Sequence, residues 1–219
     1  TLDAAVPVVI TGAMRTSTDP DWDGPQNLRD AVSVAAHRES AGRGTMVVFA
    51  GRILGGLSAV KLDAFGLDAF GSPHAPSLGR VAAGVPRYDR PPSGERRSLT
   101  VPGLTARVAL IPLLLGDDGV LLDAARPLFD GVVIEGFGRG NVPPGALPAI
   151  MRWLEAGKPV VLASRCPFGE VGGEYAFEGG GGLLLRQGVL AAGPRPRSLA
   201  RLELLLCLSA GVLYGSGLG

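Results

Sequence analysis

Short apolar runs and helical stripes alternate along the first part of the chain. Residues 6–10 are largely apolar and end at Thr11, which is typical of a strand buried on both faces. The helical stripe that follows consists of Leu28, Ala31, Val32, Ala35 and Ala36. It lies within a predicted helix that begins at Pro25 and is capped by Asp23 or by the glycine after it. A second apolar run at 45–49 completes a strand–helix–strand order, which predicts a parallel α/β sheet.

The same alternation returns in the second half of the chain. We expect strands at 107–115, 132–134 and 159–163, and helices at 118–128, 144–156, 183–187 and 198–208. Ser198 is expected to cap the last helix. Open sheets of this kind bind ligands beyond the carboxyl ends of their strands. The candidate site therefore lies on three loops, at 11–24, 136–144 and 164–173.

Two segments depart from this alternation. Residues 51–84 contain turn signals and short strand signals but no helical stripe, and so long a loop in a compact domain usually has a function. Residues 86–103 are rich in proline and charge, which is typical of an interdomain linker. A first domain is therefore expected at 1–85 and a second at 104–219.

Two glycine-rich segments allow more than one interpretation. The segment GFGRGN at 136–141 follows a predicted strand, but it does not meet the pattern G-x-G-x-x-G. Pro143 and Pro144 also remove two amides that would hold a phosphate. A tight turn that needs positive φ is favoured over a phosphate site. The four glycines at 179–182 are interpreted as a turn in preference to a flexible lid.

The composition narrows the function classes. Of 219 residues, 46% are hydrophobic and 19% are charged, the net charge is +1, and the mean hydropathy is +0.28. A chain this apolar has to bury a core, which excludes a disordered protein. The near-neutral charge gives no electrostatic reason to expect nucleic acid or a membrane as a partner. The longest uncharged stretch, 204–219, is shorter than the about 20 residues that span a bilayer, and it predicts a buried helix.

Few side chains qualify for catalytic chemistry. The two cysteines lie far apart, and neither histidine has an acidic or cysteine neighbour at ligand spacing, so no metal site is expected. The G-x-S-x-G pattern of a serine nucleophile is absent. Of the 21 basic residues, only Lys61 and Lys158 are lysines. Lys61 stands in an apolar setting, where burial or a nearby cation would make a lysine a usable base, and the ordinary alternative is a surface lysine.

Five stretches in a fixed order carry a family resemblance. VVITGAMR (8–15) and DGPQNLRDAVSVAA (23–36) resemble a segment that reads roughly VVLTGAMRP…DGPxNLxxAVxxAA in the bacterial-type L-asparaginases. The long loop at 51–81 resembles their R-x-x-K loop, which ends in F-x-S-P…LG. Residues 131–144 resemble their G-x-G-x-GN-x-P loop, and residues 159–171 resemble their PVV-x-SSR-x-P-x-G strand and turn. The likeness spans almost the whole chain.

The resemblance implies a two-domain α/β amidohydrolase whose N-terminal domain is incomplete in this chain. Residues 1–85 would be the later part of that domain, 86–103 the linker, and 104–219 the C-terminal domain. The family hydrolyses L-asparagine to L-aspartate and ammonia through a threonine nucleophile, and a second threonine, a lysine and an aspartate assist proton transfer. Its members are homotetramers built as dimers of dimers, and no metal or organic cofactor is expected.

The site residues carry over from the resemblance position by position. Lys61 falls on the catalytic lysine of the family. Thr11, Gly12 and Ala13 fall on a loop that borders the substrate pocket. Asn141 falls on the asparagine that reaches the active site from a partner subunit.

Several family features are absent or changed. The T-G-G-T-I and H-G-T-D-T segments, which carry both threonines and the aspartate, do not occur, so the chain is expected to be a fragment that is inactive alone. The segment 63–65 reads Asp-Ala-Phe where the family has His/Asn-Thr-Thr, and Arg139 replaces an asparagine. Two alternatives stay open: a divergent, non-catalytic member with a binding or assembly role, and a glutamine-directed relative such as a glutaminase or an amidotransferase subunit. The compartment also stays open, with the cytoplasm favoured over the periplasm or secretion.

Overall fold

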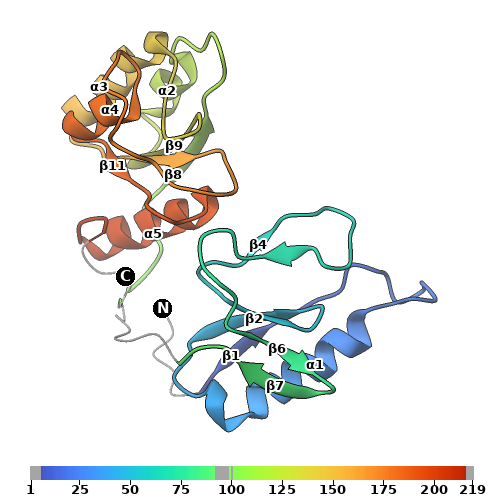
Figure 1. The fold of residues 1–219 in the computed structure, drawn as a ribbon. Helices are drawn as coiled ribbons and strands as arrows, with labels where there is room; N and C mark the ends of the chain where they lie inside the picture. Colours follow the sequence, from blue (N-terminus) through green and yellow to red (C-terminus); the bar gives the residue numbers. More distant parts are fainter. Residues whose placement is uncertain (1–5, 92–98, 100, 216–219) are drawn as a thin grey trace. The chain divides into compact units, whose positions relative to one another are not determined.

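The computed structural model describes residues 6–91, 99 and 101–215, which belong to two compact units (Figure 1). The first unit takes in residues 2–95 and the second residues 96–219. The division falls within the segment whose composition predicts a linker. The start of that segment differs from the prediction, because β7 (Val85–Tyr88) pairs with β6 (Gly79–Ala82) and keeps residues 86–88 in a sheet. Residues 92–98 and 100 of the predicted linker lie outside the described residues.

In its described part, the first unit is built on a five-stranded sheet of order β1-β2-β3-β6-β7. The other strands are β1 (Val8–Ile10), β2 (Thr45–Phe49) and β3 (Arg52–Gly55). The pair β1 and β2 is parallel, which confirms the predicted strand–helix–strand unit, whereas the three other pairs, from the region predicted as loop-like with short strands, are antiparallel. The cause is the turn at Ala50 and Gly51, whose φ values are 47° and 71°. A two-residue turn with positive φ at both positions closes a β-hairpin.

Helix α1 (Gly24–Ala36) packs on this sheet, and the 3-10 turn η1 (Arg38–Ser40) follows it. The core between α1 and the sheet consists of Ala31, Val34, Met46, Val48 and Ile53. Two residues of the predicted apolar stripe, Leu28 and Val32, are instead 58% and 59% exposed. The buried face carries Asn27 and Asp30 in their place. The stripe therefore predicts the helix, but of its five residues only Ala31 lies on the buried face.

The region that the sequence predicts as loop-like contains a hairpin of its own. Strands β4 (Val60–Lys61) and β5 (Phe70–Gly71) pair antiparallel, and Figure 1 shows them on the other side of the sheet from α1. The ring centroids of Phe49 and Phe70 lie 4.8 Å apart. This aromatic contact fastens the hairpin to β2.

The second unit has the predicted parallel sheet. Its described strands have the order β11-β10-β9-β8 and are parallel throughout. The strands are β8 (Val108–Pro112), β9 (Gly131–Gly136), β10 (Val160–Ser164) and β11 (Leu190–Ala191). The helices are α2 (Val120–Ala125), α3 (Leu147–Glu155, after the 3-10 turn η2 at Pro144–Ala146), α4 (Gly181–Arg186) and α5 (Arg197–Ala210). All seven elements predicted for this unit are present, with shifted ends.

Helices cover both faces of this sheet (Figure 1). Val132 and Ile134 point into a core with α2, α3 and α4, in which Trp153 is fully buried. Val133, between them on β9, points to the other face and packs with Leu204 of α5. Alternate residues of one strand thus serve two cores, which explains why the strands read as continuous apolar runs.

Helix α5 begins differently from the prediction. Its N-cap residue is Pro196, and its first residue is Arg197, so Ser198 lies inside the helix and does not cap it. Within the described residues, none of the helices is both long enough and apolar enough to cross a membrane.

Candidate active site

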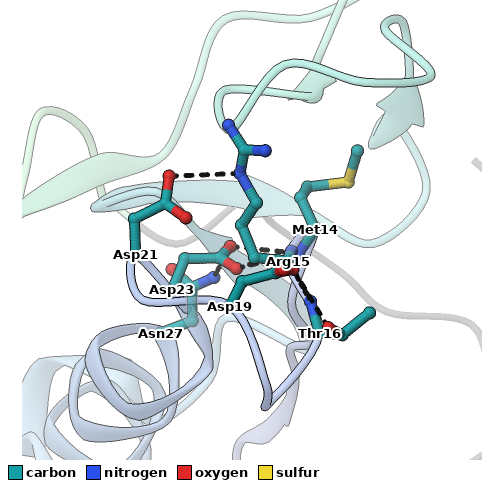
Figure 2. Close-up of polar contacts among 7 residues, drawn as sticks. All are labelled: Met14, Arg15, Thr16, Asp19, Asp21, Asp23 and Asn27. Carbon is teal, nitrogen blue, oxygen red and sulfur yellow. Dashed lines mark hydrogen bonds and ion pairs between the residues drawn. The ribbon is translucent and has the colours of Figure 1, made fainter.

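One carboxylate holds the loop that follows β1. Asp23 accepts the backbone N–H of Met14 at 3.0 Å and the backbone N–H of Arg15 at 3.0 Å (Figure 2). Asp23 occupies the N-cap position of α1, as the sequence predicts, but its side chain makes no capping hydrogen bond to the helix. The backbone N–H groups that the carboxylate binds are therefore those of the loop and not those of the first helical turn.

Asn27, one helical turn later, joins three segments. Its Nδ2 donates to the Asp23 carboxylate at 2.9 Å and to the carbonyl oxygen of Gly12 at 3.0 Å. Its Oδ1 accepts the N–H of Ala50 at 3.0 Å. Asn27 is only 3% exposed, and its buried amide has partners for both its donor and its acceptor atoms.

The same contacts stabilise the charge on Asp23. Partial burial opposes ionisation, but the N–H groups of Arg15 and Met14 and the amide of Asn27 outweigh that effect and lower the pKa of Asp23. Asp23 is therefore an anion at neutral pH, and hydrogen bonds to an anion are stronger than those to a neutral acceptor.

The three residues predicted to border the substrate pocket lie at the start of this loop. The Thr11 hydroxyl donates to the carbonyl of Val48 at 2.7 Å, which ties the loop to β2. Gly12 and Ala13 are exposed. A β-carbon on Gly12 would lie 3.8 Å from the ring of Phe49, so the loop passes directly over the end of β2.

Lys61 lies on the short hairpin. It is exposed, its backbone pairs with Phe70, and its ammonium makes no hydrogen bond within the described residues. Asp63 accepts the N–H groups of Phe65 at 2.8 Å and Gly66 at 3.0 Å. The N–H groups of Gly66 and Phe65 lower the pKa of Asp63, and the charge of Lys61 lowers it further. The Asp-Ala-Phe segment, which departs from the family pattern, therefore forms a turn with an anion beside Lys61.

Contacts link the loop after β1 to the hairpin that carries Lys61. The Arg15 guanidinium carbon lies 5.3 Å from the centroid of the Phe65 ring, within the range of a cation–π contact. At the other end of the hairpin, the ring of Phe70 makes a tilted contact with the ring of Phe49, which the loop crosses at Gly12. The structure thus brings the predicted pocket loop and the hairpin of the predicted lysine together in the first unit.

Asn141 belongs to the second unit, where it closes a turn after β9. The N–H of Phe137 donates to the Asn141 carbonyl at 2.7 Å, and Gly138 and Gly140 have φ values of 47° and 99°. These angles confirm the tight turn that the sequence favours over a phosphate loop. The Asn141 side chain is held by its Oδ1, which accepts the N–H of Gly181 at 3.2 Å.

Hydrogen bonds join the loops that follow β9 and β10 around Asn141. The N–H of Gly172 donates to the carbonyl of Arg139 at 3.1 Å, and the Ser164 hydroxyl donates to the carbonyl of Gly138. Arg139 Nε donates to Glu174 at 3.0 Å. This hydrogen bond lowers the pKa of Glu174 and gives Arg139, another departure from the family pattern, a partner across the two loops.

Two family models match the chain in the order of its two units. The model described as "Asparaginase, N-terminal" matches residues 1–93, and the "Glutaminase/Asparaginase C-terminal domain" matches residues 107–213. The chain belongs to the asparaginase family.

Asparaginases from several organisms are similar to this chain. A probable L-asparaginase of Deinococcus radiodurans is 39% identical over 215 residues, covering 96% of this chain and 65% of the relative. An L-asparaginase of Bacillus licheniformis is 30% identical over 214 residues, again covering 96% of this chain and 65% of the relative. The crystal structure of a probable cytoplasmic L-asparaginase from Campylobacter jejuni matches with a TM-score of 0.83 at 27% identity, over 95% of this chain and 67% of that one. This asparaginase-family chain spans 65% of the length of both curated relatives.

The sequence does not single out two residues that organise this candidate site. Both are matched positions of the DGPxNL motif, but the sequence gives Asp23 no role except as a possible helix cap and gives Asn27 no role. The signal is their spacing, because residues four apart share one face of a helix, and a polar pair on a buried face needs partners. No group of three or more His, Cys, Asp or Glu that could hold a metal ion is found in the described part of the chain.

Proposed function

We propose that the protein containing this chain is an L-asparaginase-type amidohydrolase, which converts L-asparagine and water to L-aspartate and ammonia. The observation that carries this proposal is the collinear match of both asparaginase-family models, together with relatives named L-asparaginase. The first unit would then be the later part of the N-terminal domain, and the second unit the C-terminal domain.

The proposed route is acyl transfer through a threonine that lies outside these 219 residues. The threonine oxygen attacks the side-chain amide carbon of asparagine, the C–N bond breaks, and the NH2 group takes up the proton lost by the threonine hydroxyl and leaves as ammonia. Water then hydrolyses the acyl-enzyme ester, which releases L-aspartate and restores the threonine hydroxyl. Lys61 assists proton transfer to and from the nucleophile, beside the carboxylate of Asp63 that the turn holds. No metal or organic cofactor takes part in this route.

The remaining predicted site residues bind substrate in this proposal. Thr11, Gly12 and Ala13 form a wall of the pocket, which the contacts from Val48 and Asn27 hold in place. Asn141 enters the pocket from a neighbouring subunit of a dimer of dimers. The proposed compartment is the cytoplasm, which the name of the Campylobacter jejuni relative also states for that protein.

The test is ammonia release from L-asparagine by the protein extended to include the missing threonine segments. Lys61→Met should abolish turnover without lowering the melting temperature, because the Lys61 side chain is exposed and makes no hydrogen bond within the described residues. The 219-residue chain alone should release no ammonia. Lys61-dependent release by that chain alone would overturn the proposal that the nucleophile lies outside it.

Two other functions have an observation in their favour. The C-terminal family model is described for glutaminases as well as asparaginases, so a glutamine-directed enzyme is the second candidate. Comparing L-asparagine with L-glutamine at equal concentrations separates these two. The changes at 63–65 and at Arg139 favour a non-catalytic relative with a binding or assembly role, and turnover of either amide by the extended protein would exclude it.

A further inference from the structure

We propose that Asp23 and Asn27 are positioning residues that fix the backbone from Gly12 to Arg15 against the β2–β3 turn. The consequence for catalysis rests on the function proposed above. The positioning itself rests on contacts within the first unit, and it can be tested without any turnover.

The first step is the use that Asp23 makes of its carboxylate. A helix N-cap aspartate ordinarily accepts an N–H from the first turn of its own helix. Here the carboxylate accepts two consecutive N–H groups from a loop eight and nine residues earlier in the chain. Because the Asp23 side chain makes no cap hydrogen bond, its carboxylate is available to hold the loop. Its hydrogen bonds to the loop are therefore not explained by helix stability alone.

The second step is the reach of Asn27. Its Nδ2 binds both the carboxylate of Asp23 and the carbonyl of Gly12, while its Oδ1 binds the N–H of Ala50. A single buried side chain therefore sets the spacing between the pocket loop and the β2–β3 turn. A change of one methylene in its length would break one of these contacts.

The third step is the strained turn that Asn27 supports. Ala50 has a φ of 47°, a left-handed conformation that a residue with a β-carbon rarely adopts. The ring of the residue before it, Phe49, makes a tilted contact with the ring of Phe70, and Phe70 pairs with Lys61 in the hairpin. The hydrogen bond from Ala50 to Asn27 thus holds the turn that directly follows Phe49, and Phe49 contacts the β4–β5 hairpin that carries Lys61.

The direct test is nuclear magnetic resonance on the backbone amides of Met14 and Arg15. In the wild-type chain both amide protons should shift together with pH, at a common midpoint below that of an ordinary aspartate. Asp23→Asn should remove this titration and increase hydrogen exchange at both amides by about tenfold or more. The other charged groups of the loop are Arg15, Asp19 and Asp21, and Arg15 pairs with Asp21 at 3.4 Å.

Asp19→Asn is the matched control. Asp19 lies in the same loop and carries the same charge, but it accepts the N–H of Thr16 at 2.8 Å and makes no bond to Met14 or Arg15. The Asp19→Asn variant should leave the titrations of the Met14 and Arg15 amide protons unchanged. The titration of the wild-type chain tests the proposal even if Asp23→Asn does not fold. Amide proton shifts of Met14 and Arg15 that do not change with pH, or that change with the midpoint of an ordinary aspartate, would contradict the proposed positioning role of Asp23.

The catalytic consequence is tested in the extended protein. Asp23→Asn should lower kcat/KM for L-asparagine by about tenfold to a hundredfold, since small displacements of positioning groups have effects of that size. Asn27→Asp should act in the same direction, whereas Asp19→Asn should stay within about twofold of wild type. If the wild type turns over and Asp23→Asn keeps its kcat/KM, the catalytic role is overturned. If the wild type releases no ammonia, the proposed function fails while the amide titrations still test the positioning.

Discussion

The two lysines of the chain illustrate how differently one residue type is used. Lys158 is half-buried, and its Nζ donates to the carbonyl oxygens of Arg126 and Phe129, both at 2.7 Å. These carbonyls follow the end of α2, where a cation is favourable. Lys61, by contrast, is exposed and has no hydrogen-bond partner within the described residues. Lys158 therefore stabilises the fold, and Lys61 is the lysine whose amine is available for the proposed proton transfer.

Lys158→Met should consequently lower the free energy of unfolding. Two carbonyls lose a charged donor, and such hydrogen bonds contribute about 1.5–3 kcal/mol each when they are well formed. Urea unfolding of the chain measures the loss, with Lys61→Met as the control that should unfold like the wild type. Equal destabilisation by both substitutions would contradict the structural assignment of Lys158.

At the scale of elements, the glycines at 179–182 connect α4 to the loops around Asn141. A β-carbon at Gly182 would overlap the carbonyl oxygen of Gly173, and one at Gly181 would lie 2.7 Å from the carbonyl oxygen of Arg139. The helix start thus packs directly on loop backbone. The predicted turn is therefore present only at the start of the segment, since Gly181 and Gly182 begin α4, and the close packing gives these two glycines a steric reason.

Gly182→Ala should therefore destabilise the second unit by about 1–3 kcal/mol, the usual effect of overpacking. This loss exceeds the up to about 1 kcal/mol that alanine gains over glycine in a helix. Gly173→Ala is the control, because a β-carbon there meets nothing within 4 Å. Thermal unfolding of both variants measures the difference, and an unchanged melting temperature for Gly182→Ala would contradict the packing.

Helices α2 and α3 are joined by a contact that depends on pH. Arg152 donates to the carboxylate of Asp123, and this hydrogen bond is the main cause of the lowered pKa of Asp123. A carboxyl whose pKa is lower in the folded state adds stability above its unfolded pKa of about 3.9. That contribution disappears as the pH falls through the folded value.

Arg152→Gln should raise the pKa of Asp123 towards the value of an ordinary aspartate. Carboxyl carbon chemical shifts followed by nuclear magnetic resonance between pH 2 and 6, a range set around the about 3.9 of a free aspartate, measure it. Glu174, whose pKa is lowered by its hydrogen bond from Arg139, is the internal reference that should behave alike in both proteins. A pKa of Asp123 that stays low in the variant would assign the effect to another group.

At the scale of the whole molecule, the sequence predicts the second unit better than the first. Each strand of the second unit is buried by helices on both faces, so its apolar run is visible without knowledge of its neighbours. In the first unit, the reversal at Ala50 contains one glycine and no proline, and its positive φ is sustained by the distant Asn27. Sequence spacing does not reveal that contact, so the antiparallel pairing after β2 is missed.

The candidate site likewise contains residues that the sequence predicts and residues that it does not. Resemblance to the asparaginases supplies Lys61, the pocket loop and Asn141 as predictions, because their motifs are local. Asp23 and Asn27 act on residues far away in sequence, and a polar residue on a helix is ordinarily taken to face solvent. The exposed Leu28 and Val32 reverse that expectation, since the polar residues take the buried face.

The proposed sharing of Asn141 between subunits predicts complementation. If each site takes Lys61 from one subunit and Asn141 from another, a mixed dimer of Lys61→Met and Asn141→Ala proteins keeps one intact site. Random pairing makes half the dimers mixed, so about a quarter of the sites should recover. Unfolding and refolding the two extended variants together, followed by ammonia release, measures the recovery, with each variant refolded alone as control. No recovery from a mixed sample would place both residues in the same subunit.

The unequal surroundings of the two lysines also bear on chemical modification of the protein. The amine of Lys158 donates to two carbonyls and lies 5.9 Å from the centroid of the Trp153 ring, whereas the amine of Lys61 is exposed. A limiting amount of an acylating reagent should therefore react with Lys61 first. Immobilisation through lysine amines would therefore attach the support at the proposed catalytic position.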